Sequence, residues 1–281
     1  MRSPTLPIPV MKLVSTAEFI SGAGLIVCAS SASTSDTEST TAPTTRPLTF
    51  STITTVKLLY SAVSQPSFRR RSTIGTMTPR EDLLRFLDAV PEHVLTVIDE
   101  AYFQYVEDPS FPDAIEEAAK RGRNVLALRT FSKIFGLAGL RIGYGVGPAG
   151  VVSAMRKVQR AFDVTTPAQE AALASLDDDA ELERRRAVNR DAMAALEAVL
   201  REHGFDPISP AVGNFLFVDV GEDAAALDQR LLRRGVIVRP MGSFGAPSAL
   251  RITAGTPEEI AFLAEQLDAV LVPEAGRIPV S

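Results

Sequence analysis

The sequence predicts an α/β fold, with a mainly parallel sheet in a larger domain and a smaller α+β domain at the C-terminal end. From Gly75 onward, helical patterns alternate with short apolar runs, which is typical of a mainly parallel sheet covered by helices. Two of these runs, 124–128 and 141–146, have the composition of strands buried on both faces. A length of 281 residues allows a sizeable core in one large domain or in two smaller ones.

The elements of the larger domain follow in order along the chain. Residues 79–87 carry apolar residues at helical spacing and acids in the first turn, which favours a helix. Thr166 as a cap, with Pro167 in the first turn, indicates the start of another helix. The expected elements are a helix at 79–87, strands at 94–98, 124–128 and 141–146, and helices at 151–161 and from Thr166.

The smaller domain begins with a long charged helix. This helix is expected from about Asp178 to His203, because Gly204 is a good C-terminal stop, and its charges indicate a solvated face. The alternation of strand and helix patterns after Gly204 predicts an α+β domain. Its expected elements are strands at 214–220, 236–239 and 250–253, and helices at 224–234 and 257–271.

Residues 1–71 differ in composition from the rest of the chain. More than half of positions 30–55 are Ser or Thr, without sustained helical or strand periodicity. This composition predicts a low-complexity or poorly ordered segment, serving as a solvated linker or alternatively as an interaction or modification tail. The predicted organisation is therefore 1–71 for this segment, 72–177 for the larger domain and 178–281 for the smaller one.

Composition excludes several classes of function. A net charge of −5 and the absence of a long basic block argue against a nucleic-acid partner. Cys28 cannot form an internal disulfide, and His93 and His203 are too few for a dense metal site, so no metal is expected. No apolar run is long enough to span a membrane, and a secretory signal is unconvincing, which favours a cytoplasmic protein without a membrane partner.

One segment carries the residues of a cofactor site. Thr130, Ser132 and Lys133 follow an apolar run directly, and strand ends are where α/β sheets usually place their ligands. A lysine there can form a Schiff base with a carbonyl cofactor, while the hydroxyls and Arg141 hold a phosphate. The alternative for Lys133 is an ordinary solvated surface charge.

The strings at 130–144 and 98–102 resemble the lysine and aspartate motifs of fold-type I pyridoxal-phosphate aminotransferases. The resemblance is to the histidinol-phosphate and aromatic aminotransferase branch, and it extends over about 75–272. It implies a class I/II aminotransferase with pyridoxal 5'-phosphate as cofactor. It also implies a partial large domain with a mainly parallel sheet and a small α+β domain, joined by the long helix.

The resemblance implies a role for each site residue. Lys133 matches the lysine that bonds to the cofactor and moves the proton, with Asp99 and Tyr102 as the other catalytic residues. Asp99 matches the partner of the pyridine nitrogen, and Tyr102 the partner of the ring hydroxyl. A carboxylate at that nitrogen keeps it protonated, so that the ring accepts electrons. The positions that match contacts of the cofactor phosphate are Thr130, Ser132 and Arg141.

The resemblance also places substrate residues in the smaller domain. Arg251 matches the arginine that binds the substrate carboxylate or phosphate, a task that suits a guanidinium. Arg239 matches a second anion-binding position, and Asn214 lines the site. The implied reaction is transamination of histidinol phosphate or an aromatic amino acid with 2-oxoglutarate and glutamate. The implied partners are the amino-acid and 2-oxo-acid substrates and, because family sites lie between subunits, a second copy in a homodimer.

Two departures from the family favour another interpretation. Residues 72–74 stand where the family has an asparagine that bonds the cofactor hydroxyl. Residues 1–71 also do not match the family's N-terminal half, with its phosphate loop and ring-stacking aromatic residue. The alternative is therefore a truncated, non-catalytic aminotransferase remnant. A third reading, a ligand-sensing module, predicts an upstream helix-turn-helix that residues 1–71 do not show.

Overall fold

The computed structural model describes the chain as two compact units. The described residues are 15–16, 25–28, 53–57, 75–121, 124–160 and 163–271, and the first three ranges are described by their backbone. Within these ranges, unit 1 holds the residues up to 57, 79–103 and 108–178, and unit 2 holds 75–78, 104–107 and 179–271. Most of the predicted segment 1–71 lies outside the described residues.

The sheet of unit 1 is mixed. Its described strands lie in the order β1-β2-β6-β5-β4-β3. Parallel pairs are β2 with β6, β3 with β4 and β4 with β5, whereas β1 with β2 and β5 with β6 are antiparallel. The predicted α/β class with a mainly parallel sheet is confirmed. The strands are β1 Ser15–Thr16, β2 Leu25–Cys28, β3 Ile53–Lys57, β4 Leu95–Asp99, β5 Val125–Thr130 and β6 Gly143–Val146.

Three strands of this sheet belong to the segment for which composition predicts no strand. β3 pairs with β4 along its whole length, from Ile53 opposite Leu95 to Lys57 opposite Asp99. β2 pairs with β6 from Ile26 opposite Tyr144 to Cys28 opposite Val146. These pairings join residues far apart in sequence, so local composition does not reveal them.

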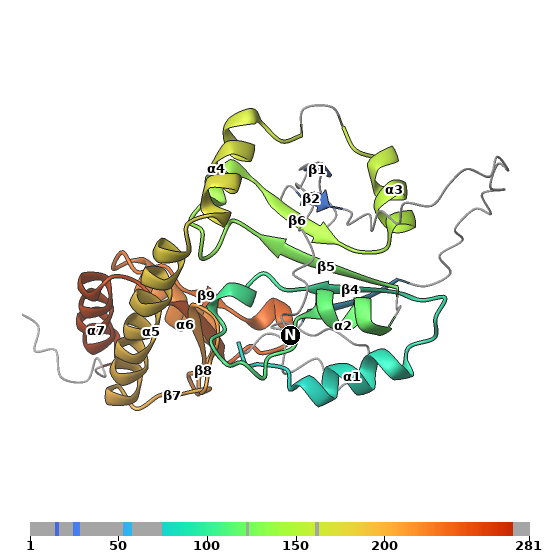
Figure 1. Cartoon of the computed structure of the whole chain (residues 1–281). Helices are drawn as coiled ribbons and strands as arrows, with labels where there is room; N and C mark the ends of the chain where they lie inside the picture. Colours follow the sequence, from blue (N-terminus) through green and yellow to red (C-terminus); the bar gives the residue numbers. More distant parts are fainter. Residues whose placement is uncertain are drawn as a thin grey trace, which may run out of the picture. The chain divides into compact units, whose positions relative to one another are not determined.

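Helices cover both faces of the central strands in unit 1. Val151 of α3 packs with Leu95, Val97 and Leu126 on one face, and Figure 1 shows α1 and α2 on the other side of β4 and β5. Helix α2 was not predicted. Helix α4 is capped by Thr165 rather than by the predicted Thr166, because the Thr165 hydroxyl accepts a hydrogen bond from the backbone N–H of Ala168. The helices are α1 Arg80–Ala89, α2 Ala114–Arg121, α3 Ala149–Lys157 and α4 Thr166–Leu176.

Unit 2 has an antiparallel sheet in the order β7-β8-β10-β9 among its described strands. The predicted strand at 236–239 is wrong in extent, because only Arg239 and Pro240 have register partners in β10. The strands are β7 Asp206–Pro207, β8 Phe215–Asp219, β9 Arg239–Pro240 and β10 Ala249–Thr253. The helices are α5 Asp179–Glu202, α6 Ala224–Leu232 and α7 Pro257–Leu271, close to their predicted positions.

One face of this sheet packs against the three helices. The alternating residues Leu216 and Val218 of β8, with Leu250 and Ile252 of β10, join apolar side chains of α5, α6 and α7 in one core. Gly204 follows α5 with a φ of +80°, a conformation that suits glycine and ends the helix. None of the described helices is long and apolar enough to cross a membrane.

Leu196 of α5 provides a test of this core. Its side chain is fully buried, so Leu196→Ala should lower the free energy of unfolding by about 2–5 kcal/mol. Val188→Ala on the same helix, at a position 55% exposed, should change it by less than about 0.5 kcal/mol. Urea unfolding followed by circular dichroism measures both, and equal effects would contradict the described packing.

Candidate functional site

The segment after β5 is held by buried apolar side chains that leave Lys133 exposed. Phe131 is fully buried and its ring centroid lies 5.0 Å from that of Phe135 and 5.7 Å from that of Tyr144. Ile134 is also buried. Since Phe131 and Ile134 are buried, Lys133 is placed on the exposed side of the segment.

Lys133 lies beside Tyr102, which comes from the turn after β4. Its Nζ is 5.3 Å from the centroid of the Tyr102 ring, and Tyr102 itself is only 4% exposed. A cation over a ring face at this distance is weakly attractive. The structure thus brings together two predicted catalytic residues that are separated by 31 positions, since β4 and β5 are parallel neighbours.

Ser132 has the geometry of an anion ligand. Its backbone N–H donates to Thr130 Oγ1 at 3.1 Å, which folds the segment back at the strand end. Its own Oγ is buried and has no hydrogen-bond partner among the described residues. Buried hydroxyls are normally paired, so this one fits a ligand oxygen such as that of a phosphate.

Arg141 reaches the same loop from its other end. It is an exposed residue with a φ of +54°, an uncommon conformation for a residue other than glycine. Its Nη1 donates to the carbonyl of Ala138 at 2.6 Å. Two positions later, Gly143 pairs with Thr130 in the antiparallel β5–β6 ladder, so the backbones around the two predicted phosphate contacts lie close together.

Asp99 ends β4 and shapes the turn that carries Tyr102. Its Oδ1 accepts from the backbone N–H of Ala101 at 3.1 Å, and the residue is half-buried. The structure therefore shows Asp99 in a turn role at the end of β4, and its cofactor role stays a prediction.

An ion-pair cluster that sequence reasoning missed adjoins these residues at the ends of β4 and β5. Glu100 is fully buried, and its Oε2 is 2.9 Å from both Nε and Nη2 of Arg129. The same Nη2 lies 2.9 Å from Oδ2 of Asp113, and the guanidinium carbon is 3.7 Å from the centroid of the Phe103 ring. The available signal was Arg129 itself, a charge inside an apolar strand, which requires a partner.

The cluster changes the protonation of its members. Burial raises the pKa of Glu100 from its usual 4.5 to about 7, although the charge of Arg129 and the hydrogen bond from Ala114 oppose this shift. Asp113 raises it further, as a second negative charge. Burial also raises the pKa of Tyr144, which lies opposite Arg129 in the sheet.

The predicted substrate residues lie in unit 2. Arg239 and Arg251 are direct cross-strand partners, so both project from one face of the sheet. That face is the one opposite the helices, and it also carries Phe217 with Met241. The guanidinium carbon of Arg251 is 5.0 Å from the ring centroid of Phe215. Two like charges opposite one another repel, which favours an anion bound near them.

Asn214 stands at the start of β8 in the same unit. Its carbonyl accepts from the backbone N–H of Ala254 at 2.9 Å, beyond the end of β10. The structure thus places Arg239 and Arg251 in the sheet of unit 2, with Asn214 directly before β8, and the predicted cofactor residues in unit 1.

Comparison with known proteins identifies the family. The model of the family aminotransferase class I and II matches residues 71–267. The chain belongs to this family, as its motifs predict. Histidinol-phosphate aminotransferase 2 of Methylococcus capsulatus is 45% identical over 199 residues, covering 71% of this chain and 53% of the relative. That of Pseudomonas fluorescens is 45% identical over 197 residues, covering 70% and 53%.

Solved structures give the same result. Histidinol-phosphate aminotransferase from Sinorhizobium meliloti, in complex with pyridoxal-5'-phosphate, matches with a TM-score of 0.68 and 28% identity, covering 77% of this chain and 57% of that one. Aromatic aminotransferase from Pyrococcus horikoshii matches with a TM-score of 0.62 and 25% identity, covering 70% and 56%. The chain spans about half the length of the curated relatives it matches.

The raised pKa of Glu100 predicts a dependence of stability on pH. The folded state binds the proton more tightly than the unfolded state, so this carboxyl favours folding below pH 4.5. That contribution is lost as pH rises through about 7. The unfolding free energy of the wild type should fall by up to about 3 kcal/mol more than that of Glu100→Gln over this range.

Chemical denaturation at a series of pH values measures this difference. Glu202→Gln, which changes an exposed carboxyl at the end of α5, should reproduce the wild-type profile. Parallel profiles for the wild type and Glu100→Gln would contradict the shift.

Proposed function

We propose that this chain is a pyridoxal-phosphate-dependent aminotransferase that acts on histidinol phosphate or an aromatic amino acid, with 2-oxoglutarate and glutamate as the exchange pair. The observation that carries the proposal is the placement of Lys133 beside Tyr102 and next to Ser132, whose buried hydroxyl has no hydrogen-bond partner within the described part of the chain. The names of the relatives, histidinol-phosphate and aromatic aminotransferases, support the substrate class.

The residues of unit 1 fit the cofactor. Ser132 offers a buried hydroxyl to a phosphate oxygen, and Thr130 shapes the turn that presents it. Arg141 adds positive charge at the other end of the same loop. When bound, pyridoxal phosphate supplies an aldehyde that condenses with amines and a ring that accepts electrons. Asp99, at the end of β4, is the proposed partner of the ring nitrogen.

Lys133 is the proposed base that removes and returns the substrate proton. An amine does this work only when it is neutral, and a nearby positive charge or loss of water favours the neutral form. The buried side chains of Phe131 and Ile134 hold its backbone, so its Nζ moves on its own flexible stem. Tyr102, at the edge of the site, is the proposed hydrogen-bond partner of the ring hydroxyl.

The arginine pair of unit 2 is the proposed substrate anchor. Arg251 offers a planar fork that matches a carboxylate or a phosphate, and Arg239 adds a second positive charge across the strand pair. Asn214 is proposed to line the same site.

We also propose that the chain forms a homodimer in the cytoplasm, which is what the resemblance and the composition of the sequence predict. Sedimentation of the purified protein tests the assembly.

The first test of this function is the absorbance of the purified chain with added pyridoxal phosphate. The wild type should develop a visible band that bleaches when an amino donor is added, because the bound cofactor absorbs there and changes on reaction. Lys133→Ala should abolish the band, whereas Lys157→Ala, an exposed lysine of α3, should retain it. No Lys133-dependent band in folded wild-type protein would favour the alternative, a non-catalytic remnant.

The second test concerns Arg251. The carboxylates of 2-oxoglutarate should stabilise the wild type by mass action and raise its melting temperature. Arg251→Gln should weaken this binding by about tenfold to a hundredfold, since charge-assisted hydrogen bonds are lost. Arg233→Gln, an exposed arginine at the end of α6, is the matched control. An unchanged response in Arg251→Gln would exclude it as the anchor.

A further inference from the structure

We propose that Glu100 and Arg129 are positioning residues whose buried ion pair, completed by Asp113, holds the Lys133 segment in register with the Asp99 turn. This inference rests on the proposed function, because it assigns these residues to the cofactor site. They touch neither Lys133 nor Tyr102 by any described contact, and act through the backbone on either side.

The pair joins the two strand ends that carry the site. Glu100 is the residue directly after Asp99, and Arg129 is the residue directly before Thr130. The backbone N–H of Glu100 also donates to the carbonyl of Leu128 at 2.8 Å. A main-chain hydrogen bond and a side-chain ion pair therefore both join the ends of β4 and β5 at Glu100. A shift of one strand end along the other therefore requires breaking the ion pair.

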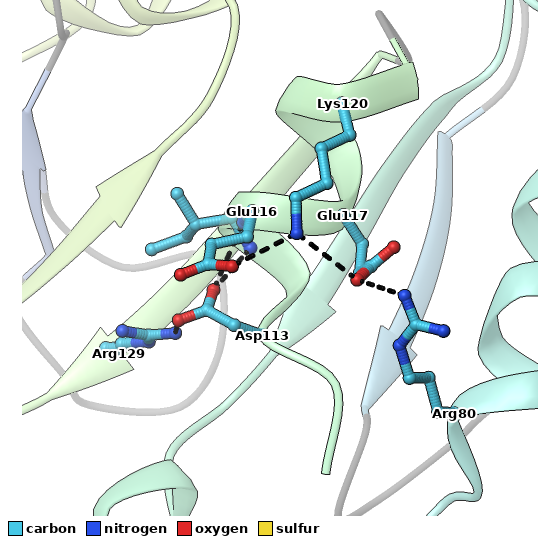
Figure 2. A network of polar contacts seen from close by, with 7 residues as sticks. Arg80, Asp113, Glu116, Glu117, Lys120 and Arg129 are labelled. Carbon is cyan, nitrogen blue, oxygen red and sulfur yellow. Dashed lines mark hydrogen bonds and ion pairs between the residues drawn. The ribbon is translucent and has the colours of Figure 1, made fainter. Parts of the chain in front are cut away.

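A third element completes the cluster. Asp113 accepts from the backbone N–H groups of Ile115 and Glu116 at the start of α2, while its other oxygen faces Arg129. Glu100 Oε1 accepts from the N–H of Ala114 at 3.0 Å in the same helical turn. Figure 2 shows Arg129 and Asp113 pointing toward one another. Backbone N–H groups at the start of α2 thus hold the carboxylates of Glu100 and Asp113, which both contact the guanidinium of Arg129.

The rest of α2 extends this connection to α1. Lys120 lies 3.2 Å from Glu116 and 3.8 Å from Glu117, which in turn is 2.7 Å from Arg80 (Figure 2). Apart from Glu117, these side chains are largely exposed, so they add little to the free energy of folding. The ion pair with both side chains largely buried is Glu100 with Arg129.

Stability alone is a weak reason for such a buried pair. Removing two charges from water costs several kcal/mol per ion, and apolar replacements are often as stable or more stable. The pair instead fixes the orientation of the Arg129 side chain, because Glu100, Asp113 and the ring of Phe103 all contact its guanidinium. Catalysis needs such precision, since a displacement of about 1 Å can cost about a hundredfold in rate.

Hydrogen exchange in the protein without cofactor tests the positioning. Glu100→Ala removes the carboxyl group that Ala114 and Arg129 contact, and Arg129→Lys keeps the charge but removes the fork. Each should accelerate exchange about tenfold in peptides covering 100–103 and 129–133, since about 1.4 kcal/mol of local opening energy is lost. Val151→Ala, which removes core contacts on the other face of the sheet, is the control for general destabilisation.

Titration with pyridoxal phosphate supplies the second measurement. If the wild type binds, both variants should raise the Kd about tenfold, while Val151→Ala should leave it near the wild-type value. Exchange that rises equally in all three variants, or in none, would overturn the positioning role, as would an unchanged Kd in a binding protein. If the wild type does not bind, the proposed function fails, and the exchange pattern alone decides whether the pair holds the segment.

Discussion

Arg129 lies with its guanidinium between two carboxylates and the face of Phe103, near the end of a strand whose preceding residues are apolar. The charge of Glu100 is tolerated at full burial because this guanidinium and the N–H of Ala114 surround it. Removing Glu100 leaves the guanidinium with Asp113 as its one acidic partner in the cluster, and removing Arg129 leaves Glu100 with the N–H of Ala114. The ends of β4 and β5, and with them the candidate cofactor site, depend on this contact.

Around this contact, the site combines rigid backbone with an accessible amine. Phe131, Ile134 and Phe135 are buried on one side of the segment, and Lys133 lies exposed between them. The proposed role of Lys133, forming and breaking covalent bonds, needs an accessible side chain on a fixed main chain, and this arrangement suits that role. The arginine pair of unit 2 is built differently, from cross-strand neighbours on the sheet face that the helices leave uncovered.

Several features were predictable because they depend on neighbours in the sequence. Helix α7 has the predicted bounds, and α5 ends before Gly204 as its backbone requires. Helix α2 was missed, since its start depends on Asp113 and Glu100, the latter 14 positions before Ala114. The strands of segment 1–71 were missed because their partners lie far along the chain. The short β9 was overextended because apolar composition does not specify which residues pair.

The sequence by itself determined the family and the order of the main elements, and it supplied the candidate groups of the site, because motifs and periodicity are local properties of the chain. Only the tertiary structure decided which of those groups meet. Lys133 lies beside Tyr102 because parallel pairing aligns two distant strand ends. Arg129 finds Glu100 for the same reason, and its buried charge requires a partner that no local pattern identifies.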